Sequence, residues 1–212
     1  MHTKLFNIHN LITIKINYTH VGILRDIDFP FSFFETTVDD GHPDLILNIC
    51  PFEPILKNTF VVDHKYYVTK DYFFCNDQSN KSKWKVAISG LNSSPTVVDF
   101  EGSIIGLERF LIPNYLAQNV ILRPLLELKL LEKGYVMLHG VGLSYNDDSI
   151  LLLGRGGAHK TPLIMDLLKQ KIDYKITGDD RSLIGPKSEL FSLPIFYNVL
   201  TFKSQHMTDE HI

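Results

Sequence analysis

The chain has 212 residues, a formal net charge of −3 and 44% hydrophobic residues, a composition typical of a globular protein with a full core. The weakly acidic balance offers no general attraction to nucleic acid or to an anionic membrane, and no stretch approaches the ~20 consecutive apolar residues of a membrane-spanning helix. The opening residues lack the long apolar segment of a secretory signal, and the two cysteines, Cys50 and Cys75, form no Cys-x-x-Cys pair. These features predict a cytoplasmic protein with two buried thiols and with neither nucleic-acid nor membrane partners.

The first hundred residues are rich in β-branched and aromatic side chains broken by turn residues, which predicts a β-rich region. Residues 11–18 alternate with a period of two, as a half-buried strand does. Further strands are expected at 44–49, 60–63, 66–69, 72–75 and 84–88, with a polar loop at 76–82. The spacing favours a small antiparallel sheet in an N-terminal region that we assign to residues 1–115.

Residues 116–212 alternate helical and strand patterns, which predicts a mixed α/β core. A helix is expected at 122–133, with Pro124 in its first turn, Gly134 at its C-terminal cap, and Leu128 and Leu131 within one broad apolar face. Residues 135–144 are expected to form one strand, and residues 149–153 form a short apolar strand that runs into a glycine-rich segment. A second amphipathic helix, with Leu163 on its apolar face, and a strand at 172–176 follow.

The glycine-rich segment at 154–161 follows the phosphate-loop pattern G-x-x-x-x-G-K-[ST] at Gly154, Lys160 and Thr161. In such a loop, backbone N–H groups at a helix N-terminus surround phosphate oxygens. These N–H groups would come from Gly156, Gly157, Ala158 and His159. Lys160 would neutralise the β- and γ-phosphates, and the Thr161 hydroxyl would ligate Mg²⁺. The alternative is a glycine-rich turn that binds nothing.

His159 stands where the pattern requires its second glycine. A side chain at this position must fit where glycine normally lets the backbone approach the phosphates. Histidine tolerates the left-handed backbone region better than most residues, so the loop can survive the replacement. Two interpretations remain open: the histidine weakens the site, or its imidazole contacts a phosphate.

Asp179 and Asp180 follow the strand expected at 172–176. Adjacent carboxylates at a strand end, downstream of a phosphate loop, suit a shared task in which one supports Mg²⁺ and the other accepts a proton. The alternative is a solvated Asp-Asp turn. His139, taken alone, is a histidine in an apolar strand and is compatible with a core position.

Five elements occur in a fixed order: Leu138-His139-Gly140, an apolar strand, the phosphate loop, a helix, and Asp179-Asp180-Arg181. This order resembles the catalytic core of the HPr kinase/phosphorylase family and its kinase relatives, which share a core with ATP-dependent phosphoenolpyruvate carboxykinase. The resemblance implies a P-loop mixed-sheet kinase core that uses ATP and Mg²⁺. It implies that Asp179 is the base on a hydroxyl, that Asp180 supports the metal, and that His139 lies beside the reacting phosphate.

By the same resemblance, the phosphoryl acceptor is a hydroxyl on a protein, a peptide or a small molecule, and a homo-oligomer is left open. The family's catalytic domain continues further beyond the aspartate pair than this chain does, so the chain is expected to be either a shortened relative or a fragment of a longer one. The N-terminal half does not match the regulatory domain of the bifunctional members, which argues against phosphorylase activity. The alternative function is a catalytically impaired nucleotide-binding or regulatory module that kept the fold.

Overall fold

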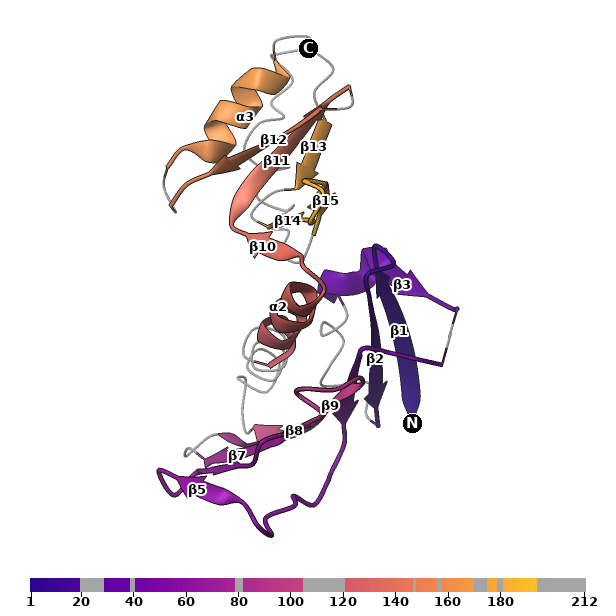
Figure 1. Cartoon of the computed structure of the whole chain (residues 1–212), viewed down its shortest axis with the longest axis vertical. Coiled ribbons are helices and arrows are strands. Elements are labelled where there is room, and N and C mark those ends of the chain that lie inside the picture. Colours follow the sequence, from indigo (N-terminus) through magenta and orange to yellow (C-terminus); the bar gives the residue numbers. More distant parts are fainter. Residues whose placement is uncertain are drawn as a thin grey trace. The chain divides into compact units, whose positions relative to one another are not determined.

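The computed structural model describes residues 1–19, 29–38, 41–78, 82–104, 121–146, 148–155, 158–169, 175–178 and 181–193. The chain forms two compact units, Met1–Lys133 and Gly134–Ile212, whose elements are labelled in Figure 1. The fold is mixed α/β and rich in strands, and the unit boundary lies further along the chain than residue 115, where the sequence analysis placed it. Among the described helices, none has the length and apolar character needed to cross a membrane.

The first unit is built on a nine-stranded sheet with the order β3-β1-β2-β4-β9-β8-β7-β6-β5. Its strands are β1 (His2–Ile8), β2 (Ile12–Tyr18), β3 (Glu35–Thr36), β4 (Leu45–Ile49), β5 (Phe60–Val62), β6 (Tyr66–Val68), β7 (Tyr72–Gln78), β8 (Ser82–Ser89) and β9 (Thr96–Ile104), and a 3-10 helix, η1 (Phe29–Phe34), precedes β3. Strand β4 pairs in parallel with both β2 and β9, whereas the other pairs are antiparallel. The expectation of a purely antiparallel sheet is therefore wrong: the sheet is large and mixed.

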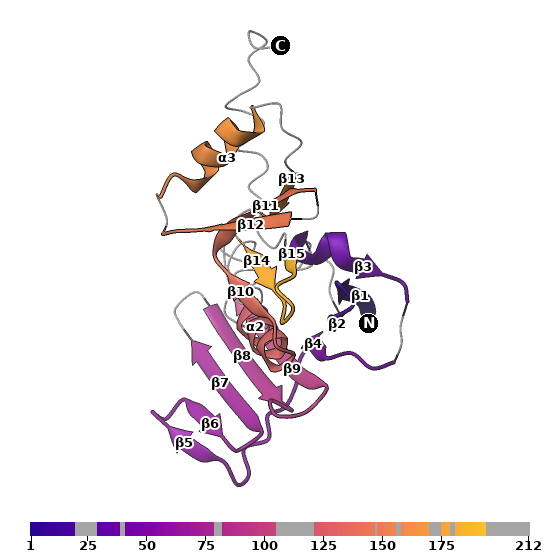
Figure 2. The same cartoon turned by 45° about the horizontal axis from the view of Figure 1, so that its top comes forward.

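The connection from β4 to β9 contains a four-strand meander, β5 to β8, which Figure 2 shows side by side. Strand β7 runs on to Gln78 and β8 begins at Ser82, so the loop expected at 76–82 is shorter. The polar residues Asn76 and Asp77 are in strand conformation because they pair with Lys85 and Trp84 of β8. Cross-strand pairing here overrides the local preference of polar residues for turns.

Helix α2 (Arg123–Glu132) belongs to the first unit and buries Leu125, Leu126 and Leu130. Leu128 and Leu131, which we expected on the same apolar face, are 39% and 59% exposed. The apolar stripe is therefore narrower than the leucine content indicates.

The larger core is lined by the inward side chains of the sheet. Its fully buried large members in the first unit are Phe6, Phe31, Phe100, Ile8, Ile12, Ile14, Ile16, Leu45, Leu47, Leu122, Leu126 and Leu130.

Two lysines tie α2 to the sheet. Lys129 is only 4% exposed, and its Nζ donates to Leu91 O at 3.3 Å, to Ser93 O at 3.0 Å and to Glu132 Oε2 at 3.0 Å. The Nζ of Lys133 donates to Leu11 O at 2.6 Å and to Asp44 Oδ1 at 2.7 Å. Because a buried ammonium is costly unless each N–H has an acceptor, Lys129 fixes the helix in one place.

A row of polar side chains crosses four adjacent strands of the first unit. Thr3 Oγ1 donates to Asn17 Oδ1 at 2.9 Å, Asn17 Nδ2 donates to Asn48 Oδ1 at 2.9 Å, and Asn48 Nδ2 donates to Asp99 Oδ1 at 2.8 Å. The same residues are register partners across β1-β2-β4-β9. The row therefore links side chains along the hydrogen-bonding direction of the sheet.

The two thiols differ in burial. Cys75 is buried, as expected, whereas Cys50 is half-buried. Burial raises the pKa of both thiols, and the carboxylates of Asp99 and Glu101 raise that of Cys50 further. Both side chains are therefore predominantly protonated at neutral pH and are poor nucleophiles.

The second unit contains two three-stranded sheets, β10-β14-β15 and β12-β11-β13. The strands are β10 (Val136–Leu138), β11 (Gly140–Tyr145), β12 (Asp148–Leu153), β13 (Lys175–Gly178), β14 (Ser182–Ile184) and β15 (Leu190–Ser192). The single strand expected at 135–144 is therefore two strands that belong to different sheets and are separated by His139.

Helix α3 (Lys160–Leu168) lies alongside the second of these sheets (Figure 1). Ile164 packs with Val141 and Leu143 of β11, and Leu152 and Leu167 extend this small core. Leu163 is 50% exposed and does not lie on the buried face, contrary to expectation. This packing holds the start of α3, and with it the loop that precedes the helix, against the end of β12.

Candidate phosphate-binding site

Three chain segments with predicted site residues meet at the same end of the strands in the β12-β11-β13 sheet. Leu153, the last residue of β12, pairs with Gly140, the first residue of β11. On the other side of β11, Gly142 pairs with Gly178, the last residue of β13. The chain therefore enters or leaves the sheet three times at this end of the strands: after β12, before β11 and after β13.

Gly140 explains the Leu-His-Gly sequence on steric grounds. A Cβ on Gly140 would lie 2.8 Å from Leu152 O and 2.8 Å from Leu153 Cδ2, closer than real Cβ contacts come. The glycine lets β11 approach β12 closely. His139, the residue before it, is exposed. The buried hydroxyl of Ser182, at the start of β14, donates to Gly140 O at 3.5 Å, so the β10-β14-β15 sheet is also joined to this end of β11.

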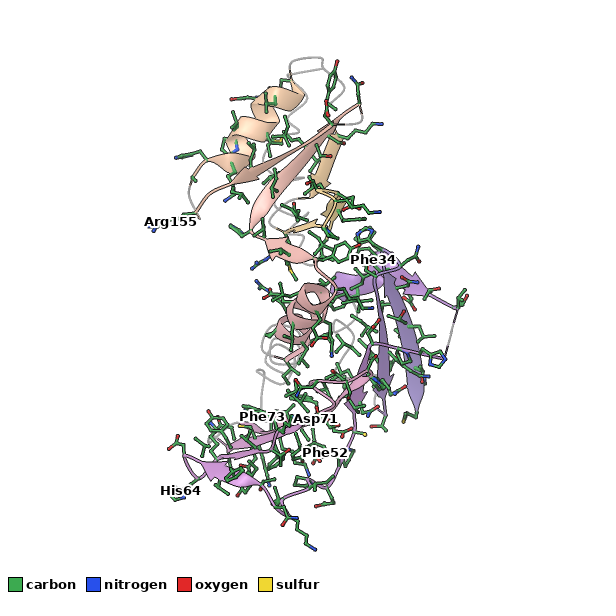
Figure 3. The ribbon with its side chains drawn as sticks, viewed as in Figure 1. Phe34, Phe52, His64, Asp71, Phe73 and Arg155 are labelled. Carbon is green, nitrogen blue, oxygen red and sulfur yellow. The ribbon has the colours of Figure 1, made fainter. Side chains whose placement is uncertain are left out.

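The loop after β12 turns back on itself. A Cβ on Gly154 would lie 3.0 Å from Ala158 Cβ and 3.6 Å from Lys160 Cδ, so only glycine fits without displacing a neighbour. The N–H of Ala158 donates to Arg155 O at 3.1 Å, which closes the turn. Figure 3 shows the Arg155 side chain extending away from the ribbon at this loop.

His159 adopts the backbone conformation that the missing glycine would supply. Its φ is 54° and its ψ is 29°, in the left-handed region, and it is the N-cap of α3. Its carbonyl accepts the N–H of Leu163 at 3.2 Å, which begins the helix. Alternation of right- and left-handed residues turns successive N–H groups toward one point, the arrangement that binds anions in phosphate loops. The path of the described loop residues therefore tolerates the histidine, whose imidazole is exposed.

Lys160 joins the loop to His139. Its Nζ donates to Gly154 O at 2.7 Å and to Arg155 O at 3.2 Å, and it lies 3.4 Å from Nε2 of His139. The Lys160 side chain therefore lies over the first two residues of the loop. Of the predicted site residues, the structure brings His139, Gly154, Ala158, His159 and Lys160 together.

Other predicted site residues lie outside the described part of the chain. Gly156, Gly157, Asp179 and Asp180 fall there, and so does the side chain of Thr161, whose backbone is in the first turn of α3. Within the described residues there is no group of three or more His, Cys, Asp or Glu side chains that could hold a metal ion. The magnesium set predicted from Thr161 and Asp180 therefore stays a prediction.

Arg181 is a residue to which the sequence analysis gave no role of its own. Its Nε is buried and has no hydrogen-bond partner among the described residues. A buried guanidinium nitrogen without an acceptor is costly, which makes an anionic partner favourable. The Asp-Asp-Arg sequence contained the signal, since an arginine directly after a carboxylate pair adds positive charge next to the predicted metal site.

Comparisons with protein-family models, with curated protein sequences and with solved structures gave no significant match.

Proposed function

We propose that this protein is a kinase-like phosphotransferase of the HPr kinase type, which binds ATP through residues 154–161 and transfers the γ-phosphoryl group to a hydroxyl. The observation that carries the proposal is the position of the Lys160 ammonium, which spans the loop carbonyls and lies 3.4 Å from His139. This places a cation and an imidazole together at the start of a helix, where anions are stabilised.

Several features of the local geometry support phosphate binding. Helix α3 is nine residues long and directs its first free N–H groups toward the loop, so its positive end favours an anion there. Gly154 and the left-handed His159 set the backbone path, and Lys160 supplies a full positive charge. A phosphate oxygen would replace a loop carbonyl as acceptor of one Lys160 N–H, so that the ammonium would face a negative charge instead of a neutral carbonyl.

The transfer step requires groups that come after β13 and at the start of α3. In this proposal the carboxylate of Asp179 accepts the proton of the acceptor hydroxyl, and the oxygen of that hydroxyl bonds to the γ-phosphorus. The bond between that phosphorus and the β,γ-bridging oxygen breaks, and a nucleoside diphosphate leaves. Mg²⁺, which neutralises phosphate charge when bound, would be held by the Thr161 hydroxyl and the Asp180 carboxylate.

His139 is proposed to contact the reacting phosphate from its position just before β11. Its Nε2 is already within 3.4 Å of Lys160 Nζ, so both groups would face the same phosphoryl oxygens. In the tautomer that carries the proton on Nε2, the imidazole adds a second hydrogen-bond donor beside the lysine. Such donors stabilise charge that spreads over the transferred group.

Calorimetric titration with Mg-ATP tests the binding half of this proposal. Lys160→Ala should weaken binding about 10- to 100-fold, because it removes one charge-assisted contact. Lys169→Ala is the matched control, since Lys169 is an exposed lysine that follows the last turn of the same helix and should leave affinity unchanged. At 100 times its dissociation constant, the nucleotide should add about 2.7 kcal/mol to the unfolding free energy. Equal affinities in the two variants would exclude the loop as the site.

Phosphoryl transfer is tested separately with Asp179→Asn. The variant should bind Mg-ATP as the unmodified protein does and should lose transfer to a hydroxyl acceptor, or hydrolysis where water is the acceptor. Retained transfer would remove Asp179 from the role of base.

The alternative function is a nucleotide-binding or regulatory module that has lost the chemistry. The exposed imidazole of His159 beside the loop is the observation that favours it, since a side chain stands where the motif has none. Tight Mg-ATP binding by the unmodified protein, with no transfer or hydrolysis above the Asp179→Asn level, would select this module over the kinase.

A further inference from the structure

The first unit contains a second concave site that is independent of the phosphate loop. It is a pocket of about 740 Å³ over strands β6, β7 and β8, with Pro54 and Leu56 at one side. This volume lies within the range of small-molecule sites, roughly 300–1,000 Å³. The ligand that fits it depends on which lining side chains lie on the same face of the sheet.

The strand register shows which side chains can meet one ligand. Side chains alternate between the two faces of a strand, and residues directly opposite each other on neighbouring strands share a face. Asn76 pairs with Lys85, and Gln78 pairs with Lys83, so these four side chains project from one face. Tyr67 pairs with the residue two positions before Asn76 and therefore projects from the same face. All five line the pocket.

The segment after β4 is held over this face by a clamp on Phe52, which Figure 3 shows beside this part of the sheet. The N–H of Phe52 donates to Glu101 Oε2 at 3.2 Å, and its carbonyl accepts Lys85 Nζ. Lys85 and Glu101 also pair with each other at 3.0 Å. Further along, the N–H of Ile55 donates to Tyr72 Oη at 3.0 Å. The protein's own contacts therefore form the wall of the pocket.

The lining has three lysines and two carboxylates, although the whole chain has a net charge of −3. Lys65 pairs with Asp77 at 2.7 Å, and Lys85 pairs with Glu101. The hydrogen bond from Lys65 holds the pKa of Asp77 below its usual value, so this pair is ionised at neutral pH. Lys83 is exposed and makes no ion pair within the described residues. Its charge remains available to an anionic group.

Two side-chain amides lie close to Lys83 on the same face. Asn76 and Gln78 are exposed, and neither side chain has a hydrogen-bond partner in the part of the chain that the structure describes. An amide both donates and accepts, which suits a ligand hydroxyl, since a hydroxyl does the same. Diagonal neighbours on one face of an antiparallel pair are about 7–8 Å apart. Asn76 and Lys83 can therefore contact opposite ends of a molecule the size of one sugar ring.

Apolar surface is confined to one side of the pocket. The half-buried ring of Tyr67 lines it there, together with Pro54 and Leu56. The Phe74 ring is only 3% exposed and offers little surface to a ligand. A single accessible aromatic ring favours a ligand with one apolar face and a polar edge. A pyranose ring has this form, because its axial C–H groups make an apolar face and its hydroxyls surround it.

We propose that this pocket binds an acidic monosaccharide of the hexuronate class. Its ring packs on Tyr67, its hydroxyls contact Asn76 and Gln78, and its carboxylate pairs with Lys83. Every group of the ligand then meets a residue that projects from the same face of the sheet. The site lies wholly in the first unit and does not depend on the kinase-like proposal for the second.

Titration of the ¹⁵N-labelled full-length protein with methyl β-D-glucuronide tests the proposal. The side-chain amide peaks of Asn76 and Gln78 should shift saturably in a ¹⁵N–¹H correlation spectrum. The indole peak of Trp84, the single tryptophan, should shift much less, because Trp84 directly follows Lys83 in β8 and projects from the opposite face. Methyl β-D-glucoside, which lacks only the carboxylate, and acetate, which keeps only the charge, should each bind at least about 10-fold more weakly.

Substitutions test the two ends of the ligand separately. Lys83→Gln should weaken binding of the glucuronide about 3- to 10-fold, because it removes the charge that meets the carboxylate. Lys70→Gln, at an exposed lysine outside the lining, is the matched control and should not change the affinity. Asn76→Ala should weaken the glucuronide and the glucoside by the same factor, since it removes a hydroxyl contact. All three side chains are exposed, so the rest of the spectrum should remain that of the folded protein.

Several results would overturn the proposal. These are unshifted amide peaks, equal affinities for the glucuronide and the glucoside, and an unchanged affinity in Lys83→Gln. Tighter binding of benzoate than of the glucuronide, detected by the same two amide peaks, would assign the pocket to aromatic acids and would also overturn it.

Discussion

At the scale of single residues, His159 shows how a motif can change in sequence while its backbone path remains. Its left-handed conformation costs an L-residue roughly 1–2 kcal/mol relative to glycine. Two contacts offset this cost: the close approach of Gly154 and Ala158 in the turn, and the first hydrogen bond of α3. The replacement therefore changes the chemistry of the loop more than its course.

Substitution of this histidine separates its backbone from its side chain. Because the path is already left-handed, His159→Gly should leave the loop in place and remove only the imidazole. We expect Mg-ATP affinity to fall about 3- to 10-fold, as loss of one hydrogen-bond donor would cause, with the melting temperature unchanged or raised. Asparagine also tolerates this backbone region and keeps a hydrogen-bond donor. The Mg-ATP affinity of His159→Asn should therefore lie between those of the unmodified protein and His159→Gly. A large gain in affinity on His159→Gly, measured by calorimetry, would identify a decayed loop.

At the scale of elements, local patterns predicted strand β2 and helix α2 to within a residue or two, because each carries its own periodicity. Strands β1 and β9 were missed. Polar and small residues such as Asp99 and Gly102 interrupt β9, and its extended state depends on pairing with β4 and β8. The split of the strand at 135–144 likewise depends on two different partner strands, which no local pattern contains.

The candidate site divides in the same way. The phosphate loop and its helix are contiguous, so the sequence showed them directly. The approach of His139 to Lys160 joins residues from two separate elements, and before the structure it rested on the family resemblance alone.

Helix α2 provides a test of how one buried charge holds an element in place. Lys129→Met keeps the length and apolar stem of the side chain but leaves Leu91 O and Ser93 O without this donor. We expect a loss of about 1–3 kcal/mol in unfolding free energy, because the variant loses hydrogen bonds that a buried charged group donates. Urea denaturation measures it, with the exposed Lys57→Met as control. A variant as stable as the unmodified protein would show that the helix is held by its leucines alone.

At the scale of the whole molecule, the two compact units make an experiment on autonomy possible. Residues 1–133 contain the nine-stranded sheet and α2, including the Lys133 contacts to Leu11 and Asp44. A fragment of residues 1–133 should therefore unfold in one cooperative transition. A fragment of residues 1–104, which lacks α2, should not, because it loses the buried leucines and both lysine ties. Circular dichroism during heating distinguishes the two, and a non-cooperative 1–133 fragment would mean that the first unit depends on the second.

The row from Thr3 to Asp99 has a directional consequence. A carboxylate only accepts hydrogen bonds, so the amide of Asn48 must present its nitrogen to Asp99 and its oxygen to Asn17. The same constraint passes to Asn17, which must in turn accept the hydroxyl proton of Thr3. One negative charge thereby sets the polarity of three neighbouring side chains. A shift of any of these strands by a single residue would break the sequence of donors and acceptors. The row therefore also fixes the register of the two parallel strand pairs, β2-β4 and β4-β9.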